Sequence, residues 1–171
     1  MTIPGLKKPD HIGITVPNIE EAIAFFTQYF GFEVAYEFGP FSSDDNWMAE
    51  QLNVHPRAEI SKIAMMNARG INLELFEYAD TVERSKTVPN NADIGGHHLA
   101  FYVDDMNAAV AYLKQQGIKV LGEPTVMTEG PTEGESWVYF MAPWGMQLEL
   151  VSYPNGKAYM KQSSVRLFDP R

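Results

Sequence analysis

Two histidines and two glutamates stand at equivalent places in this sequence and could together bind a metal ion. His11 and His98 each precede a short apolar segment, and Glu74 and Glu149 each lie inside a later one. Two imidazoles and two carboxylates suit a divalent ion such as Ni, Co, Zn, Mn or Fe, and leave coordination positions for water or substrate. Such an ion polarises a carbonyl oxygen, so that a carboxylate beside it can remove and return a proton. The expected chemistry is a lyase or isomerase reaction on a small oxygenated carbonyl compound, with Glu149, and secondarily Glu74, as both ligand and base.

An internal repeat is the reason for singling out these four residues. Residues 10–26, DHIGITVPNIEEAIAFF, align with residues 97–113, HHLAFYVDDMNAAVAYL, which places His11 over His98. A lone histidine on a strand is more often a hydrogen-bonded structural residue than a ligand. Recurrence at the same place in both halves favours the metal-binding interpretation. His97 aligns with Asp10 and points to the other side of its strand, so we expect it only to form a hydrogen bond.

The second part of the repeat contains the glutamates. Residues 71–77, INLELFE, align with residues 146–152, MQLELVS, and this alignment places Glu74 over Glu149. In both segments the glutamate alternates with leucines, so it faces the opposite side of its strand from them. Four further charged residues are weaker candidates to line the same cavity, because their strand orientation does not follow from the pattern: Glu59, Lys62, Glu77 and Glu135.

Each half has the pattern of a strand, a helix and then three strands. Apolar residues alternate along residues 10–16, and they recur at helical spacing over residues 19–29. Asn18 and Asp105 are expected N-caps. The predicted fold class is α+β, with one four-stranded sheet per half and the helices covering the apolar face of each sheet. The two opposite faces would then meet around a common centre.

The predicted organisation has two modules, a linker and a tail. The first module is residues 1–77, with a strand near 10–16, a helix at 19–29, an excursion at 39–58 and a fourth strand near 71–77. We expect the excursion to lie over the cup between the sheets and to contain a short helix, capped by Asp44 or Asp45 and ending by Pro56. Residues 78–95 form the linker, 96–153 the second module, and 154–171 a tail that wraps the surface or a partner subunit.

Composition excludes several classes of function. The net charge of -9 argues against a nucleic-acid partner, and the absence of cysteine removes disulfides, thiolate ligands and cysteine nucleophiles. No stretch reaches the ~20 apolar residues of a membrane span, and the first residues lack the apolar core of a signal peptide. We therefore expect a cytoplasmic protein whose partner is a small-molecule substrate, without a membrane partner.

The segments DHIGITV, HHLAFYVDDMNAAV, INLELFE and PWGMQLELV resemble those of the vicinal oxygen chelate superfamily, the glyoxalase, bleomycin resistance and dioxygenase-like proteins. The resemblance spans residues 10–153 and implies paired βαβββ modules that form a cup or open barrel around a divalent metal. It also implies a homodimer, and the ligand set His11, Glu74, His98 and Glu149.

Within this superfamily the four-ligand set is most similar to that of lactoylglutathione lyases and methylmalonyl-CoA epimerases. Gln28 stands where the lyases commonly carry a basic residue, and this difference disfavours glutathione as a cosubstrate. The epimerases differ at another position, because they prefer Gln at the place of Glu74. Two alternatives remain open from the sequence. One is an Fe(II)-dependent ring-cleaving dioxygenase, and the other is a non-catalytic small-molecule binding or resistance protein.

Overall fold

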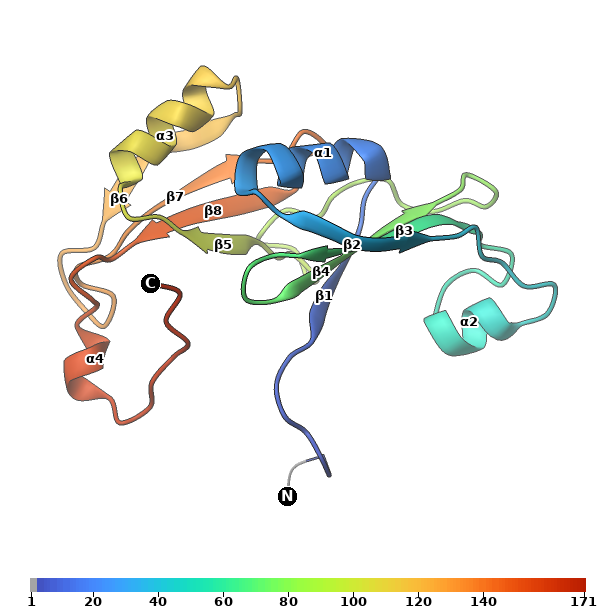
Figure 1. Ribbon diagram of the computed structural model, residues 1–171, viewed down its shortest axis with the longest axis horizontal. Helices are drawn as coiled ribbons and strands as arrows, with labels where there is room; N and C mark the ends of the chain where they lie inside the picture. The colour runs from blue at the N-terminus through green and yellow to red at the C-terminus, as the bar shows by residue number, and fades with distance from the viewer. Residues whose placement is uncertain (1–2) are drawn as a thin grey trace. The chain divides into compact units, whose positions relative to one another are not determined.

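The computed structural model describes residues 3–171 and divides the chain into two compact units, unit 1 ending at Lys86 and unit 2 beginning at Thr87 (Figure 1). Each unit contains a strand, a helix and three further strands in that order, as the repeat predicts. Within the described residues, no helix has both the length and the apolar character needed to cross a membrane.

Unit 1 is a mixed four-stranded sheet with two helices. Its strand order is β1-β4-β3-β2, with β1 parallel to β4 and the other neighbours antiparallel. The elements are β1 (His11–Thr15), α1 (Ile19–Phe30), β2 (Glu33–Phe38), α2 (Trp47–Leu52), β3 (Ile60–Asn67) and β4 (Asn72–Tyr78).

Unit 2 repeats this topology with the strand order β5-β8-β7-β6, again with one parallel pair, β5 and β8. Its elements are β5 (Leu99–Tyr102), α3 (Met106–Gln115), β6 (Val120–Val126), β7 (Ser136–Met141), β8 (Gln147–Ser152) and α4 (Tyr159–Gln162). The α+β fold class is thus confirmed, with the same mixed sheet built twice.

Helix α1 is fixed at both ends by specific contacts. The Asn18 side chain accepts a hydrogen bond from the Glu21 N–H at 2.9 Å, and the Glu77 carboxylate accepts one from the Ile19 N–H at 2.6 Å. Gly31 ends the helix at φ 65°, a conformation that a side chain disfavours, and its N–H donates to the Thr27 carbonyl at 3.1 Å. The predicted N-cap at Asn18 is confirmed. Glu77 serves this helix end, on the other side of β4 from Glu74.

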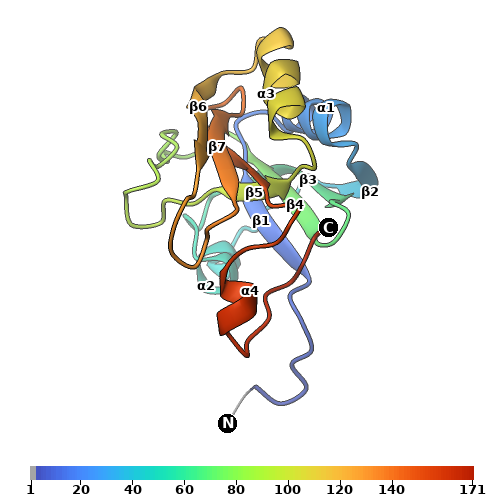
Figure 2. The same ribbon diagram turned by 90° about the vertical axis from the view of Figure 1, so that its left-hand side faces the viewer.

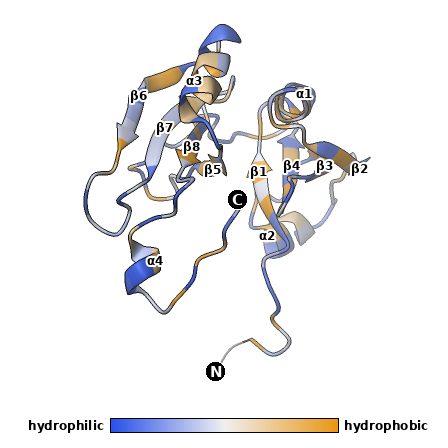
Figure 3. Cartoon of the chain, turned by 60° about the vertical axis from the view of Figure 1, so that its left-hand side comes forward, coloured by the Kyte–Doolittle hydropathy of each residue, from blue (hydrophilic) through white to orange (hydrophobic). Residues whose placement is uncertain are grey.

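Apolar faces of the sheets pack against the helices as the alternation predicts. Along β1, apolar and polar residues alternate (Figure 3). In unit 1 the core includes Phe26, Leu73 and Leu75, all essentially inaccessible to solvent. In unit 2, Asp105 caps α3 through the Ala108 N–H at 2.9 Å, and α3 contacts β6 and β8. Figure 2 shows α3 along one side of its sheet. The opposite face carries Glu74 in unit 1 and Glu149 in unit 2.

The excursion at residues 39–58 belongs to the core of unit 1. Met48 of α2 is fully buried and lies in a cluster with Ala58, Ile60 and Ile63, with Phe76 packed against it. Because Ile63 and Phe76 are cross-strand partners, they face the same side of the sheet, which is also the side of Glu74. The sequence predicts an excursion over the cup, and α2 lies on the Glu74 face, where it packs directly on its own sheet.

Candidate active site

In unit 1, His11 and Glu74 form a pair on neighbouring strands. Gly13 lies opposite Glu74 in the parallel register, so His11 stands two residues earlier on the same face. Its Nε2 atom is 3.3 Å from Glu74 Oε2, and its Nδ1 atom is 2.9 Å from Asp10 Oδ2. The hydrogen bond to Asp10 and the nearby Glu74 carboxylate raise the pKa of His11 above its usual value.

In unit 2, His98 and Glu149 repeat this arrangement. His98 Nε2 is 3.1 Å from Glu149 Oε2. His98 Nδ1 lies 3.0 Å from the amide oxygen of Asn91, a residue of the segment that precedes β5. Since an amide oxygen only accepts hydrogen bonds, Nδ1 donates to Asn91. This contact leaves Nε2 facing the Glu149 carboxylate.

Both pairs have the donor chemistry of metal ligands. With bonds of about 2.0 to 2.2 Å, two adjacent ligand atoms at right angles are about 3 Å apart, close to the 3.1 and 3.3 Å of the two pairs. Metal-bound histidines usually have their second ring nitrogen held by an oxygen, as Asp10 and Asn91 hold these two. Each unit supplies one histidine and one glutamate. Among residues 3–171, no group of three or more histidine, aspartate or glutamate side chains is assembled as a metal centre.

The remaining candidates have other surroundings. His97 Nδ1 lies 3.1 Å from the Gly95 carbonyl, the hydrogen-bonding role expected of it. Lys62 lies between Glu20 and Glu37, with its Nζ atom 2.5 and 2.6 Å from their oxygens. Its positive charge is therefore neutralised by two carboxylates of unit 1.

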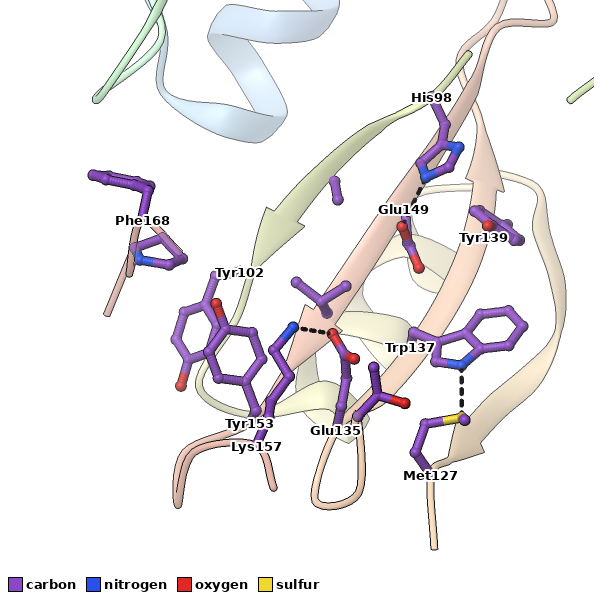
Figure 4. Close-up of a pocket in the computed structure, with 14 residues that line it drawn as sticks. His98, Tyr102, Met127, Glu135, Trp137, Tyr139, Glu149, Tyr153, Lys157 and Phe168 are labelled. Atoms are coloured by element: carbon purple, nitrogen blue, oxygen red, sulfur yellow. Dashed lines mark hydrogen bonds and ion pairs between the residues drawn. The ribbon is translucent and has the colours of Figure 1, made fainter. Parts of the chain in front are cut away.

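A cavity of about 590 Å³ lies on the polar face of the unit 2 sheet. Figure 4 shows the His98–Glu149 pair toward one end of this pocket and a second ion pair, Glu135–Lys157, toward the other. The lining residues come from all four strands or their ends and from the C-terminal tail. They are His98, Ala100, Tyr102, Met127, Thr132, Glu135, Trp137, Tyr139, Glu149, Val151, Tyr153, Lys157, Phe168 and Pro170.

Burial adjusts the carboxylate at this end of the pocket. Only 12% of the Glu149 side chain is exposed. Removal from water raises the pKa of Glu149, and Glu135 adds to this rise, whereas His98 acts in the opposite direction. A carboxylate whose pKa lies above its usual range is a better proton acceptor than an ordinary surface glutamate.

The sequence gives little or no indication that two residues, Glu135 and Lys157, belong to this pocket. Glu135 is a candidate on charge alone, and the structure places it in the pocket wall. Lys157 lies in the tail after Tyr153, which has no counterpart in the first half, so the repeat cannot indicate it. Its Nζ atom is 2.8 Å from Glu135 Oε1 and 4.2 Å from the centre of the Tyr153 ring.

The sequence also matches known proteins. It is 45% identical to 2-epi-5-epi-valiolone epimerase from an Actinomyces species, over 98% of this chain and 91% of the relative. It is 29% identical to the uncharacterized protein YaeR of Escherichia coli strain K12, over 85% of this chain and 96% of that protein.

Solved structures share the fold. A glyoxalase family protein from Bacillus cereus superposes with a TM-score of 0.67 at 18% identity, covering 88% of this chain and 98% of that one. The trypanothione-dependent glyoxalase I of Leishmania major superposes with a TM-score of 0.57 at 15% identity, covering 92% of each chain. The sequence profile of the glyoxalase, bleomycin resistance protein and dioxygenase superfamily matches residues 10–139. With this match over most of its length and the doubled sheet topology, the chain belongs to the glyoxalase/bleomycin resistance protein/dioxygenase superfamily.

Proposed function

We propose that this protein is a divalent-metal-dependent epimerase that inverts a carbon next to the carbonyl group of a small oxygenated ketone. The observation that carries the proposal is the matched pair of His–Glu contacts, each with the second histidine nitrogen held by an oxygen. The epimerase relative at 45% identity supports an isomerase over a lyase, and its name makes 2-epi-5-epi-valiolone the first substrate to test.

In the proposed mechanism the four residues His11, Glu74, His98 and Glu149, from one chain or from two copies of it, hold the ion. When bound, the ion polarises the carbonyl oxygen and makes the adjacent C–H more acidic. Glu149 accepts the proton from that carbon, because its carboxylate lines the pocket that would hold the substrate. Glu74, protonated before the reaction, delivers its proton to the opposite side of the same carbon and so inverts its configuration, and exchange with water then restores both carboxyl groups.

Asp10 and Asn91 contribute by orientation. Each holds the Nδ1 atom of one histidine and thereby directs Nε2 toward the neighbouring glutamate. The pocket beside His98 and Glu149 gives the substrate its place, since its volume of about 590 Å³ is typical of small-molecule sites.

Turnover of 2-epi-5-epi-valiolone under anaerobic conditions tests the proposal. The purified protein is freed of metal, reloaded separately with Ni, Co, Zn, Mn or Fe(II), and followed by NMR for formation of the epimer. We expect epimer formation with at least one ion in the absence of O2. Strict dependence on Fe(II) and O2, with a cleaved product, would instead establish the dioxygenase alternative. Absence of divalent-ion binding by the intact chain would leave only the non-catalytic binding alternative.

A further inference from the structure

Among the ion pairs of residues 3–171, Glu135–Lys157 is the most withdrawn from solvent. Only 10% of the Glu135 side chain and 16% of the Lys157 side chain are exposed. By contrast, the Lys114–Glu123 pair on the surface of the same unit is 47% and 78% exposed. A desolvated pair adds little stability over apolar residues of the same size, because removing both charges from water offsets their attraction. Stability alone therefore does not explain why charges stand in this pocket wall.

The pair retains hydrogen-bonding capacity for a ligand. An ammonium has three N–H donors and a carboxylate has two oxygens that accept. The contact between Lys157 Nζ and Glu135 Oε1 uses one donor and one oxygen. A hydroxyl group both donates and accepts, so two neighbouring hydroxyls of one ligand can accept from Lys157 and donate to Glu135. Hydrogen bonds to charged groups are stronger than those between neutral groups.

Aromatic rings flank the ion pair on both sides. Trp137 and Tyr139 lie on one side, with ring centres 5.3 Å apart, and Tyr102 and Tyr153 on the other, 5.0 Å apart (Figure 4). Flat apolar walls with a few convergent polar groups suit a ring whose faces carry C–H bonds and whose edge carries hydroxyls.

The charges of the pocket oppose an anionic ligand. Lys157 is the one lysine or arginine among its lining residues, and Glu135 already neutralises it, while Glu149 adds a further negative charge. Arg171 lies near the Tyr153 ring, and its guanidinium is paired with Asp169 at 2.6 Å. A phosphate or carboxylate on the ligand would find both nearby cations, Lys157 and Arg171, already paired with carboxylates. To bind Lys157 it would have to displace Glu135.

Unit 1 has no comparable space at the corresponding positions of its sheet. Glu74 pairs with Met65 across the sheet as Glu149 pairs with Tyr139, so Ile63 corresponds to Trp137 and Tyr78 to Tyr153. In unit 1 these positions pack against the cluster around the buried Met48. The substrate pocket is accordingly expected in unit 2.

We propose that Glu135 and Lys157 bind neighbouring hydroxyl groups of an uncharged, ring-shaped polyhydroxylated substrate and exclude its phosphorylated or carboxylated derivatives. The assignment rests on the proposed function only in placing the substrate beside His98 and Glu149. The pair thus determines substrate specificity, and the metal-binding residues carry the reaction.

Direct binding to the full-length protein without added metal tests this assignment independently of turnover. The probes are myo-inositol, a neutral ring polyol, and myo-inositol 1-phosphate, and calorimetry gives the two affinities. We expect the unmodified protein to favour the neutral probe by at least tenfold. In Glu135→Gln, the affinity for myo-inositol should fall about tenfold. The affinity for myo-inositol 1-phosphate should rise about tenfold, because Lys157 becomes an unpaired cation. In Lys157→Gln, the affinity for myo-inositol should fall, and the affinity for myo-inositol 1-phosphate should not rise.

Glu123→Gln removes the carboxylate of the exposed Lys114 pair and serves as the matched control, with both affinities expected to stay within twofold. Circular dichroism establishes that each variant is folded, and Lys157→Gln alone decides the question if Glu135→Gln does not fold. A purely structural ion pair would lower the melting temperature in both pocket variants and leave both affinities within twofold, which overturns the proposal. The proposal is also overturned if the unmodified protein binds myo-inositol 1-phosphate as tightly as myo-inositol, or binds neither probe. An epimerase test that fails while these affinities hold would remove the proposed reaction and leave the binding assignment intact.

Discussion

At the scale of single residues, the oxygen that holds each histidine decides which ring nitrogen remains for a metal or a proton. Asp10 holds Nδ1 of His11 and Asn91 holds Nδ1 of His98, so that both Nε2 atoms face a glutamate. The two oxygens differ in charge, because Asp10 is a carboxylate and Asn91 an amide. The pKa of His11 is raised first of all by Asp10.

Replacing the adjacent histidines one at a time separates their roles. His98→Ala should abolish binding of one Ni or Zn ion per site, because it removes a ligand. His97→Ala should leave metal binding unchanged and cost about 1 kcal/mol of stability, since it removes one hydrogen bond to the Gly95 carbonyl. Calorimetric titration of the metal-free protein measures the metal binding of each variant, and urea unfolding measures the cost in stability. The reverse result would mean that the repeat is aligned one residue out of place.

Asn91→Ala should weaken metal binding without removing a ligand. Loss of the oxygen that holds a metal-binding histidine typically lowers affinity by about 10 to 100-fold, and His98 would then be free to rotate. Asn90→Ala, at the neighbouring position, is the matched control. If Asn91→Ala and Asn90→Ala bound Ni with the same affinity, Asn91 would have no part in orienting His98.

At the scale of elements, the two units use the polar face of the same sheet differently. In unit 1, α2 covers it with an apolar cluster, whereas in unit 2 the loops and the tail leave a cavity. The tail is attached near this cavity through Arg171, which donates to the carbonyls of Tyr153 and Pro154. The same face thus packs partly against α2 in unit 1 and borders a cavity in unit 2.

Met48→Ala should destabilise the protein by about 2 to 5 kcal/mol, because it leaves a cavity in the cluster of α2, β3 and β4. Leu52→Ala, in the same helix but with a side chain 39% exposed, should cost clearly less. Urea unfolding followed by circular dichroism measures the free energy of unfolding of each variant. Equal costs for both substitutions would contradict the packing of α2 on its sheet.

Much of the element structure could be predicted from the sequence because it depends on local patterns. The alternation around Ile12 and Ile14 predicts a strand, and Asn18 and Asp105 cap the helices as expected. The packing of the excursion on its own sheet could not be predicted, because an apolar residue such as Met48 indicates burial but not the surface that buries it. Helix α2 begins at Trp47 with Asn46 at its N-cap position, so the predicted cap at Asp44 or Asp45 is wrong, although the Asp45 carboxylate accepts a hydrogen bond from the Trp47 N–H.

The site was predictable only where the repeat doubles it. His11, Glu74, His98 and Glu149 occur at matching positions, and each unit brings its own pair together. Asn91 and Lys157 lie in irregular segments whose course follows from no periodicity, so their contacts with His98 and Glu135 could not be foreseen.

At the scale of the whole molecule, we expect two copies of the chain to associate, as the family resemblance implies. Light scattering after gel filtration should give twice the mass of one chain. Metal removal should leave that mass unchanged if the ion is bound by residues of a single chain, and should lower it if the four ligands come from two chains. A monomer that retains metal binding and activity would contradict the expected homodimer.

The central claim is that Glu149 removes a proton from the carbon beside a carbonyl group and that a proton returns to the same carbon. Incubating the metal-loaded protein with 2-epi-5-epi-valiolone in D2O, and following the exchangeable position by NMR, measures this step directly. We predict deuterium at the inverted carbon of the product, and a loss of at least a hundredfold in the rate with Glu149→Gln. Epimer formed without any deuterium, or at an unchanged rate in the Glu149→Gln variant, would contradict the account.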